Sequence, residues 1–282
     1  MPVAATTAEP IPLRTAAEPA VRLRGVGKMF GEFRALDGID LDFPRGELTT
    51  LLGPSGCGKT TTLKIIAGLL EPTEGEVLVN GRPVAGPGPE RAFVFQDFAL
   101  LPWANVLRNV AFGLELRHVP KDEREEIARR NIAEVGLSGA EHKYPHELSG
   151  GMRQRVGLAR ALAVDAEILL MDEPFASVDE QNRRKFQEDL LRLLAHERKT
   201  VIFVTHSIEE AVYISDQVAV LTRNPGRLSR VVRPEIDRSG NFDDLRRTPA
   251  TTPSRPPCRA PAAAGRWCRS SGGRRRSGRA GR

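Results

Sequence analysis

A short apolar run followed directly by a glycine-rich loop constrains the fold of this chain more than any other feature. Residues 48–52 read LTTLL, and GPSGCGKT follows at 53–60. The loop matches the spacing G-x-x-x-x-G-K-[ST], whose defining positions are Gly53, Gly58, Lys59 and Thr60. Its glycines let backbone N–H groups surround phosphate oxygens, and a helix N-terminus adds positive potential. The sequence therefore predicts a strand at 48–52, a phosphate-binding loop, and a helix from Lys59 to about Leu70.

Two side chains of this loop have specific expected roles. Lys59 is expected to reach the β- and γ-phosphates of a nucleotide, and the Thr60 hydroxyl is expected to coordinate Mg²⁺. An incidental lysine in a glycine-rich turn is disfavoured, because a strand precedes the loop and a helix follows it. The rest of the expected cradle is Gly53, Pro54, Ser55, Gly56, Cys57, Gly58 and Thr61. The cysteine of this loop is expected to be alkylated slowly when a nucleotide is bound.

Short apolar runs recur along the chain and alternate with helical patterns. Beside 48–52, runs bounded by turn residues lie at 76–80, 92–95, 167–171, 200–204 and 217–221. Such runs predict buried strands, and strands that alternate with helices predict a largely parallel sheet. The expected fold class is therefore α/β.

The segment between Gln96 and Ser149 has a different pattern. Apolar residues follow one face of each of two helical segments: Leu107, Val110, Ala111 and Leu114 in the first, and Ala128, Ile132 and Val135 in the second. The segment has no good strand candidate. We therefore predict a helical subdomain, at about 97–160, inserted between two strands of one α/β core.

Two adjacent acids, Asp172 and Glu173, follow the strand candidate at 167–171. Ligands bind at the carboxyl ends of strands in open α/β sheets, and adjacent side chains of a strand point to opposite sides. We expect Asp172 to belong to the Mg²⁺ shell and Glu173 to act as general base on the attacking water. A strand-end pair that only faces solvent is disfavoured beside a phosphate loop.

His206 and Gln96 also follow strand candidates. His206 comes after TVIFVT at 200–205, where position alone supports a contact to the γ-phosphate and a structural role equally. Gln96 comes after AFVF at 92–95, and an isolated glutamine there is weak support for a contact to Mg²⁺ or water. Both interpretations stay open at this point.

A second glycine-rich helix start, LSGGMRQR, lies at 148–155. Ser149 is a good N-cap residue, but Gly150 and Gly151 each weaken a helix start by up to about 1 kcal/mol relative to alanine. The glycine pair therefore serves either a close backbone approach to another group or a tight loop before a capped helix. The spacing does not say which phosphate would be approached.

Charge separates the carboxyl-terminal part of the chain from the rest. Residues 245–282 hold eleven arginines, no lysine and no acid, so the formal net charge of +6 becomes −5 for residues 1–244. The Pro-, Gly- and Arg-rich tail predicts disorder, with a nucleic-acid or anionic-lipid arm as the functional alternative.

We expect residues 1–20 to be a flexible leader, not a secretory signal. Three scattered cysteines fit a reducing, cytoplasmic setting, and no stretch approaches the roughly 18 apolar residues of a membrane helix.

Taken together and in this order, the motifs resemble those of the ATP-binding cassette (ABC) family over roughly residues 21–230. The matching segments are GPSGCGKTT as Walker A, Gln96 as Q-loop, LSGGMRQR as signature motif, LLMDEP as Walker B, SVD at 177–179 as D-loop, and His206 as switch histidine. The resemblance implies an ABC ATPase domain at 21–244. It would be a P-loop NTPase core, with a mixed, mostly parallel sheet, an antiparallel β edge and an inserted helical subdomain. The D-loop reads ASVD where ALD is commoner in the family.

The resemblance also implies roles that the residues alone leave open. Gln96 would sense Mg²⁺ and the attacking water, and His206 would contact the γ-phosphate. Phe30 would stack on adenine, with Phe33 as the competing aromatic. The signature motif and Asp179 of the D-loop would face a nucleotide held by another subunit. The implied assembly is a head-to-tail homodimer that holds ATP and Mg²⁺.

Finer features resemble one bacterial branch, the importer ATPases of the nitrate/sulfonate/taurine type. They are LLPW at 100–103, the MRQR ending of the signature, and HSIEEAVYISDQVAVL with PGR after it. This resemblance implies an ATP-hydrolysing subunit on the cytoplasmic side of the inner membrane, served indirectly by a solute-binding protein. Leu101, Pro102 and Trp103 would face transmembrane permease subunits. The alternative is that they belong to a buried loop that only fills space in the fold. The permease and binding protein choose the solute, so the sequence leaves it open.

Two other classes of protein carry similar motifs. A soluble ABC-type ATPase that acts on nucleic acid or ribosomes is the main alternative, but only the arginine-rich tail favours it. No nucleic acid is expected for the cassette itself. A P-loop kinase is disfavoured, because LSGGMRQR would have no role there. We expect no regulatory β-domain of the kind that longer importer ATPases carry, and a frame change near Leu245 is our hypothesis for the tail.

Overall fold

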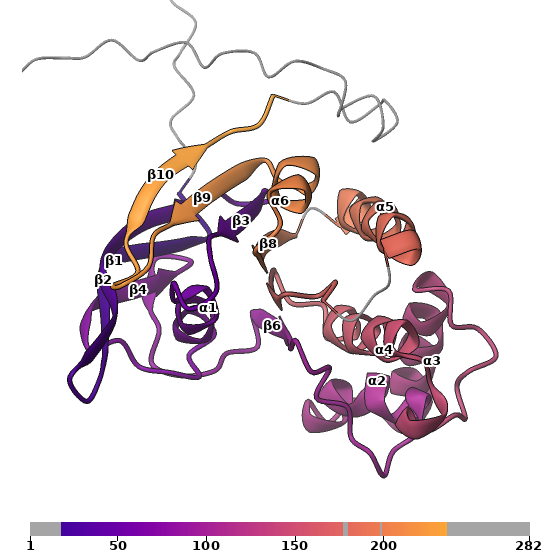
Figure 1. Ribbon diagram of the computed structural model, residues 1–282. Coiled ribbons are helices and arrows are strands. Elements are labelled where there is room, and N and C mark those ends of the chain that lie inside the picture. The colour runs from indigo at the N-terminus through magenta and orange to yellow at the C-terminus, as the bar shows by residue number, and fades with distance from the viewer. Residues whose placement is uncertain (1–17, 177–179, 198, 236–282) are drawn as a thin grey trace, which may run out of the picture. The chain divides into compact units, whose positions relative to one another are not determined.

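The computed structural model describes residues 18–176, 180–197 and 199–235, whose strands form two sheets (Figure 1). The strands of the larger sheet are β3 (Leu48–Leu52), β6 (Arg91–Val94), β7 (Ile168–Asp172), β8 (Thr200–Thr205), β9 (Gln217–Leu221) and β10 (Leu228–Val232). Their order is β10-β9-β3-β8-β7-β6, and each neighbouring pair is parallel except β10 with β9. This arrangement confirms the α/β class, with a mostly parallel sheet and an antiparallel β edge.

Burial on both faces explains why the central strands stand out in the sequence as unbroken apolar runs. Every residue of β7 and of β8 is buried. The runs at 48–52 and 217–221 coincide with β3 and β9, and the other predicted runs lie within two residues of a strand at each end. The antiparallel edge strand β10 was not among the predicted runs, because most of its residues are exposed.

The smaller sheet is antiparallel, and its strands in spatial order are β2 (Phe33–Phe43), β1 (Val21–Phe30), β4 (Glu74–Val79) and β5 (Arg82–Pro83). Apolar runs do not predict β1 or β2, because their side chains alternate between core and solvent. Val21 and Leu23 are buried, whereas Arg22 between them forms an ion pair with Asp42 at 2.7 Å. A strand with one solvated face carries this alternation instead of a continuous run.

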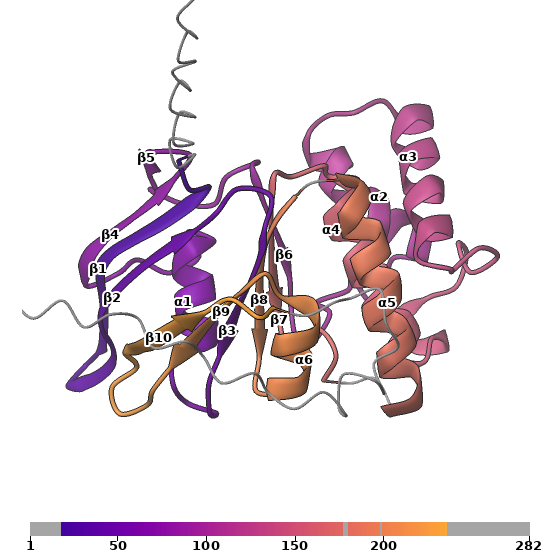
Figure 2. The same cartoon turned by 90° about the horizontal axis from the view of Figure 1, so that it is seen from above.

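Helix α1 (Lys59–Ile66) contacts β4 of the smaller sheet and β7 and β8 of the larger one (Figure 2). It ends before its predicted end. Gly68 has a φ of +74°, and its N–H donates to the Ile65 carbonyl at 3.0 Å, while the Leu69 N–H donates to the Lys64 carbonyl at 2.9 Å. These two hydrogen bonds form a Schellman motif, in which a left-handed glycine terminates the helix.

Three helices lie between β6 and β7 in the sequence. They are α2 (Val106–Leu116), α3 (Lys121–Glu134) and α4 (Gly150–Ala163), which pack against one another, and α4 also contacts β6 (Figure 1). The first predicted apolar stripe lies on α2, and the second lies on α3 and its C-cap residue Val135; Val110, Ala128 and Ile132 are fully buried. The structure describes all of residues 96–149 and places no strand there, only a further 3₁₀ helix, η1 (Pro145–Glu147).

Two further helices follow strands of the larger sheet: α5 (Glu180–Glu197) comes after β7, and α6 (Ile208–Ile214) comes after β8. Helix α6 packs against β3 and β8. Within the described ranges, no helix combines the length and the apolar character needed to cross a bilayer.

Candidate active site

The candidate site lies at the carboxyl ends of four neighbouring strands, β3, β8, β7 and β6 (Figure 2). β3 leads into the phosphate loop at Gly53, and β8 leads into His206. β7 ends at Asp172 with Glu173 directly after it, and β6 ends shortly before Gln96. Because parallel strands end at the same edge of a sheet, the strand order brings all of these segments to one edge.

Lys59, the first residue of α1, folds back on the phosphate loop. Its ammonium donates hydrogen bonds to the carbonyl oxygens of Gly53 at 2.8 Å and Pro54 at 3.1 Å, and the residue is buried. An ammonium has three N–H donors, so one remains for a phosphate oxygen. A buried cation held by neutral carbonyls is stabilised by an incoming anion, so the loop fits a nucleotide phosphate.

The phosphate loop is held in place by packing within the chain. Gly58 has a φ of +90°, and a Cβ at this position would collide with the side chain of Leu36 on β2. Cys57 is fully buried, and burial raises the pKa of its thiol. Alkylation of Cys57 therefore cannot report ATP binding as expected from the sequence, because the fold alone shields the thiol.

Thr60 and Asp172 form the part of the site that fits a divalent cation. The Thr60 hydroxyl donates a hydrogen bond to an Asp172 carboxylate oxygen at 2.9 Å, so oxygen ligands from α1 and β7 meet here. Asp172 is buried, and this burial raises the pKa of its carboxyl group. Mg²⁺ prefers oxygen ligands and would favour the charged form of this acid. Gln96 is exposed, and its side chain makes no hydrogen bond to another described residue.

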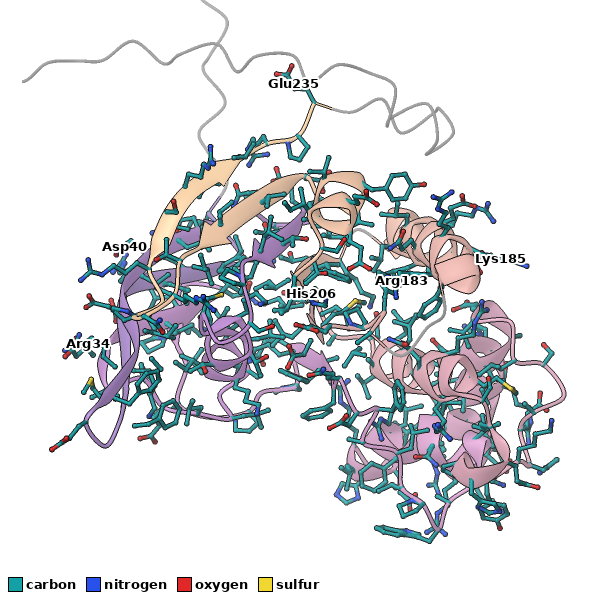
Figure 3. The ribbon with its side chains drawn as sticks, viewed as in Figure 1. Arg34, Asp40, Arg183, Lys185, His206 and Glu235 are labelled. Carbon is teal, nitrogen blue, oxygen red and sulfur yellow. The ribbon has the colours of Figure 1, made fainter. Side chains whose placement is uncertain are left out.

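Glu173 and His206 lie together beside this pair, and Figure 3 shows His206 beyond the end of β8. One Glu173 carboxylate oxygen is 3.3 Å from His206 Nδ1, and the two side chains are 19% and 62% exposed. Glu173 has a left-handed φ of +44°, which is uncommon for a residue with a Cβ, and its N–H donates to the Val204 carbonyl at 3.1 Å. Backbone strain of this kind is typical of sites that hold a side chain ready for chemistry.

The second glycine-rich helix start has an open face. Ser149 caps α4, because its hydroxyl accepts a hydrogen bond from the Met152 N–H at 3.3 Å. An added Cβ at Gly151 would meet no atom within 4 Å, so packing within the described chain does not require a glycine there. Of the two interpretations of this glycine pair, the open face favours a close approach by another molecule.

The two aromatic candidates for adenine stacking lie opposite each other where β1 turns into β2. Phe30 pairs with Phe33 in the strand register, and the residues are 49% and 58% exposed. The Lys28 ammonium lies 5.4 Å from the centre of the Phe30 ring. Either ring can receive a base, so both stay candidates. Asp179, the predicted D-loop contact, lies outside the described residues.

Comparison with protein families identifies this constellation. A family model described as ABC transporter matches residues 36–176, which is half of the chain. The chain belongs to the ABC transporter family. It is an ABC ATPase, and the phosphate loop, acid pair and glycine-rich helix start described above correspond to the Walker A, Walker B and signature motifs of this family.

Individual relatives of this ABC ATPase agree with the family match. An ABC transporter ATP-binding protein of Methanocaldococcus jannaschii is 57% identical over 205 residues, which are 73% of this chain and 77% of that protein. The taurine import ATP-binding protein TauB of Chromobacterium violaceum is 49% identical over 219 residues, 78% of this chain and 84% of TauB. The dimeric structure of MJ0796, a bacterial ABC transporter cassette, has a TM-score of 0.70 at 32% identity, and covers 77% of this chain and 100% of its own. A dimeric post-hydrolysis state of MJ0796 bound to ADP and Pi gives a TM-score of 0.68 at 33% identity, with the same coverage.

Gly226 supports the Walker A loop of the ABC ATPase site, and the sequence does not predict this contact. In the turn between β9 and β10, the Gly226 N–H donates to the Ala35 carbonyl and the Gly226 carbonyl accepts from the Asp37 N–H, each at 2.9 Å. A Cβ at Gly226 would collide with the carbonyl oxygen of Cys57 in the Walker A loop. The sequence NPG at 224–226 signals the turn, but nothing in the sequence links it to the Walker A loop.

We expect Gly226→Ala to push the Walker A loop out of place and weaken ATP binding about tenfold, because overpacking costs about 1–3 kcal/mol. The backbone at Gly226 lies outside the left-handed region, so only the added methyl group causes the effect. Titration with a fluorescent ATP analogue measures the affinity. Gly86→Ala is the matched control, since a Cβ at Gly86 would meet no atom within 4 Å. Equal affinities of the two variants would contradict the contact.

Proposed function

We propose that this ABC ATPase is the ATP-hydrolysing subunit of an importer for a small solute of the nitrate, sulfonate or taurine kind. The observation that carries hydrolysis is the single sheet edge at which the Walker A loop, the Thr60–Asp172 pair and the Glu173–His206 pair meet. The importer assignment is supported by 49% identity to a taurine import ATP-binding protein over most of both chains.

The residues of this edge divide the proposed reaction between them. Lys59 and the Walker A backbone bind the β- and γ-phosphates, and Thr60 with Asp172 would hold Mg²⁺, which neutralises phosphate charge when bound. Glu173 accepts the proton of the attacking water as general base. His206, 3.3 Å from that carboxylate, keeps Glu173 oriented and contacts the γ-phosphate.

We propose further that two copies of the chain work head to tail, with each signature motif facing the ATP held by the other copy. The open face above Gly151 supports this, because backbone N–H groups at a helix start can approach a phosphate there. The similar cassette MJ0796 is dimeric in its solved structure. A two-fold arrangement makes both sites equivalent. Asp179 belongs to the proposed interface by its place in the D-loop.

The proposed permease contact is the loop before α2, which presents Trp103 with 70% of its surface exposed. Asn109, fully buried on α2, fixes this loop: its side chain accepts from the Leu101 N–H at 2.8 Å and donates to the Ala104 carbonyl at 2.9 Å. An exposed aromatic on a rigid loop is a typical anchor of protein interfaces. The chain would thus bind permease subunits at the cytoplasmic face of the inner membrane, while a solute-binding protein delivers the solute.

The test first reads the genes that flank the gene of this chain. It then reconstitutes the full chain in proteoliposomes with any permease that they encode, and with the binding protein outside. Uptake of radiolabelled taurine, nitrate or an alkanesulfonate that needs Mg-ATP and is lost in Lys59→Ala would support the proposal. ATP hydrolysis that responds to RNA and not to the permease would contradict the importer assignment and favour a soluble ABC-type ATPase.

A further inference from the structure

The loop after Gln96 contains two consecutive residues in the left-handed backbone region. Phe98 has a φ of +59° and Ala99 a φ of +44°. Residues with a Cβ rarely adopt this conformation, because the Cβ approaches the following carbonyl oxygen. Local hydrogen bonds from the Phe98 N–H to the Phe95 carbonyl and from the Ala99 N–H to the Asp97 carbonyl close the turn but span only a few residues. A contact from elsewhere in the fold has to hold such a pair in place.

Arg160 on α4 makes that contact. Its guanidinium donates one hydrogen bond to the Ala99 carbonyl and one to the Phe98 carbonyl, both at 2.8 Å. Both acceptors are neutral, and burial lowers the pKa of Arg160. A planar guanidinium with several fixed N–H donors suits two adjacent acceptors better than an ammonium does. The Arg160 side chain therefore binds the backbone carbonyls of the left-handed pair.

The same face of α4 approaches this pair at two more positions. The Arg153 guanidinium lies 6.0 Å from the centre of the Phe98 ring, and a Cβ at Gly157 would lie 3.8 Å from the Phe98 carbonyl oxygen. Positions 153, 157 and 160 follow the spacing of one helix face. A contact at 3.8 Å is an ordinary van der Waals distance, so the Phe98 backbone lies directly beside this face of α4.

The signature motif begins this same helix. Ser149 caps α4, and Arg160 lies ten residues into it, a distance of about 15 Å at the usual rise of a helix. A continuous helix of this length transmits a displacement of one end to the other. Gln96 lies two residues before Phe98. The hydrogen bonds from Arg160 to Phe98 and Ala99 therefore connect the segment that holds Gln96 to the helix that begins with the signature motif.

We propose that Arg160 is a positioning residue that clamps the left-handed Phe98–Ala99 pair to α4, so that Gln96 and the signature motif move as one body. The inference rests on the proposed ATPase function for its consequence in catalysis. The clamp itself is a property of the fold and can be measured without nucleotide.

Hydrogen exchange without nucleotide tests the clamp directly. Amides of residues 95–104 should exchange about tenfold faster in Arg160→Met, because the left-handed pair loses its support. Arg160→Lys keeps the positive charge but loses the planar pair of N–H donors. Its exchange rates should lie between those of the unaltered chain and of Arg160→Met. Arg117→Met is the matched control, because Arg117 also donates to two carbonyls, those of Val164 and Pro89, away from the Q-loop.

Steady-state kinetics test the consequence. Arg160→Met should lower kcat about tenfold while ATP affinity changes less than about twofold, since the clamp positions Gln96 without holding the nucleotide. Adding Ala99→Gly to Arg160→Met should raise kcat about threefold above that of Arg160→Met alone, because glycine adopts the left-handed region freely. His118→Gly, which replaces another left-handed residue, φ +58°, after α2, should recover nothing.

Unchanged exchange of residues 95–104 in both Arg160 variants would overturn the clamp. Recovery by His118→Gly as large as that by Ala99→Gly would overturn it as well. Faster exchange in Arg160→Met, with no ATP hydrolysis by the unaltered chain, would support the clamp and contradict the proposed ATPase function, so the two failures are distinguishable.

Discussion

Glu173→Gln is expected to lower ATP turnover about 10²–10⁴-fold, the usual contribution of a general base, while ATP binding is retained. Glutamine keeps the shape of the side chain, so the strained backbone at this position and the neighbouring His206 stay in place. The amide cannot accept a proton from water. With binding intact and hydrolysis blocked, the variant should accumulate as a dimer with ATP in both sites.

Multi-angle light scattering in saturating Mg-ATP measures the dimer, and phosphate release measures turnover. Glu134→Gln on the exposed end of α3 makes the same chemical change away from the site and should hydrolyse ATP at the unaltered rate. A Glu173→Gln protein that stays monomeric with Mg-ATP would contradict the proposed assembly. One that keeps more than about a tenth of the turnover would contradict the general-base role.

The parts of the fold that the sequence predicted are those with a local signal. Strands β3, β7, β8 and β9 are short, mainly apolar runs without charged residues in their interior, because a parallel sheet buries both of their faces. Their order in the sheet then brings Asp172, Glu173 and His206 to one edge. β1 and β2 have one solvated face and charged residues at alternate positions, so a search for continuous runs passes over them.

The supports of the site have no local signal. Gly226 packs on Cys57, and Arg160 binds the backbone of Phe98, in each case across a long stretch of sequence. The left-handed backbone of Glu173 is equally hidden, because a glutamate gives no indication of a positive φ. Such contacts depend on how distant segments pack, so periodicity and motif spacing cannot reveal them.

Gly151→Asp is expected to reduce ATP hydrolysis at least about 100-fold, the scale of losing an electrostatic contact to the reacting phosphate. A Cβ at this position would meet no atom within 4 Å, so the variant should fold and bind ATP as the unaltered chain does. The added carboxylate would instead repel the γ-phosphate of the second copy. Gly58→Ala provides the contrast, since its Cβ would collide with Leu36 of the same chain and should impair ATP binding itself.

Thermal unfolding and titration with a fluorescent ATP analogue separate these two outcomes. Gly151→Asp should keep both the melting temperature and the affinity of the monomer, and it should fail only in ATP-dependent dimerisation and turnover. Loss of ATP affinity in the Gly151→Asp monomer would place the signature motif at the nucleotide of its own chain, against the head-to-tail arrangement.

Mixing two inactive variants gives the sharpest form of this test. Lys59→Ala removes the phosphate-binding lysine, and Gly151→Asp blocks the signature motif. In a head-to-tail heterodimer of the two, one site combines both defects, while the other joins an intact Walker A loop to an intact signature motif. Random pairing makes half of the dimers mixed, each with one working site, so the mixture should recover about a quarter of the unaltered activity. If both elements of a site came from one chain, every site would carry a defect, and the mixture would stay as inactive as its components.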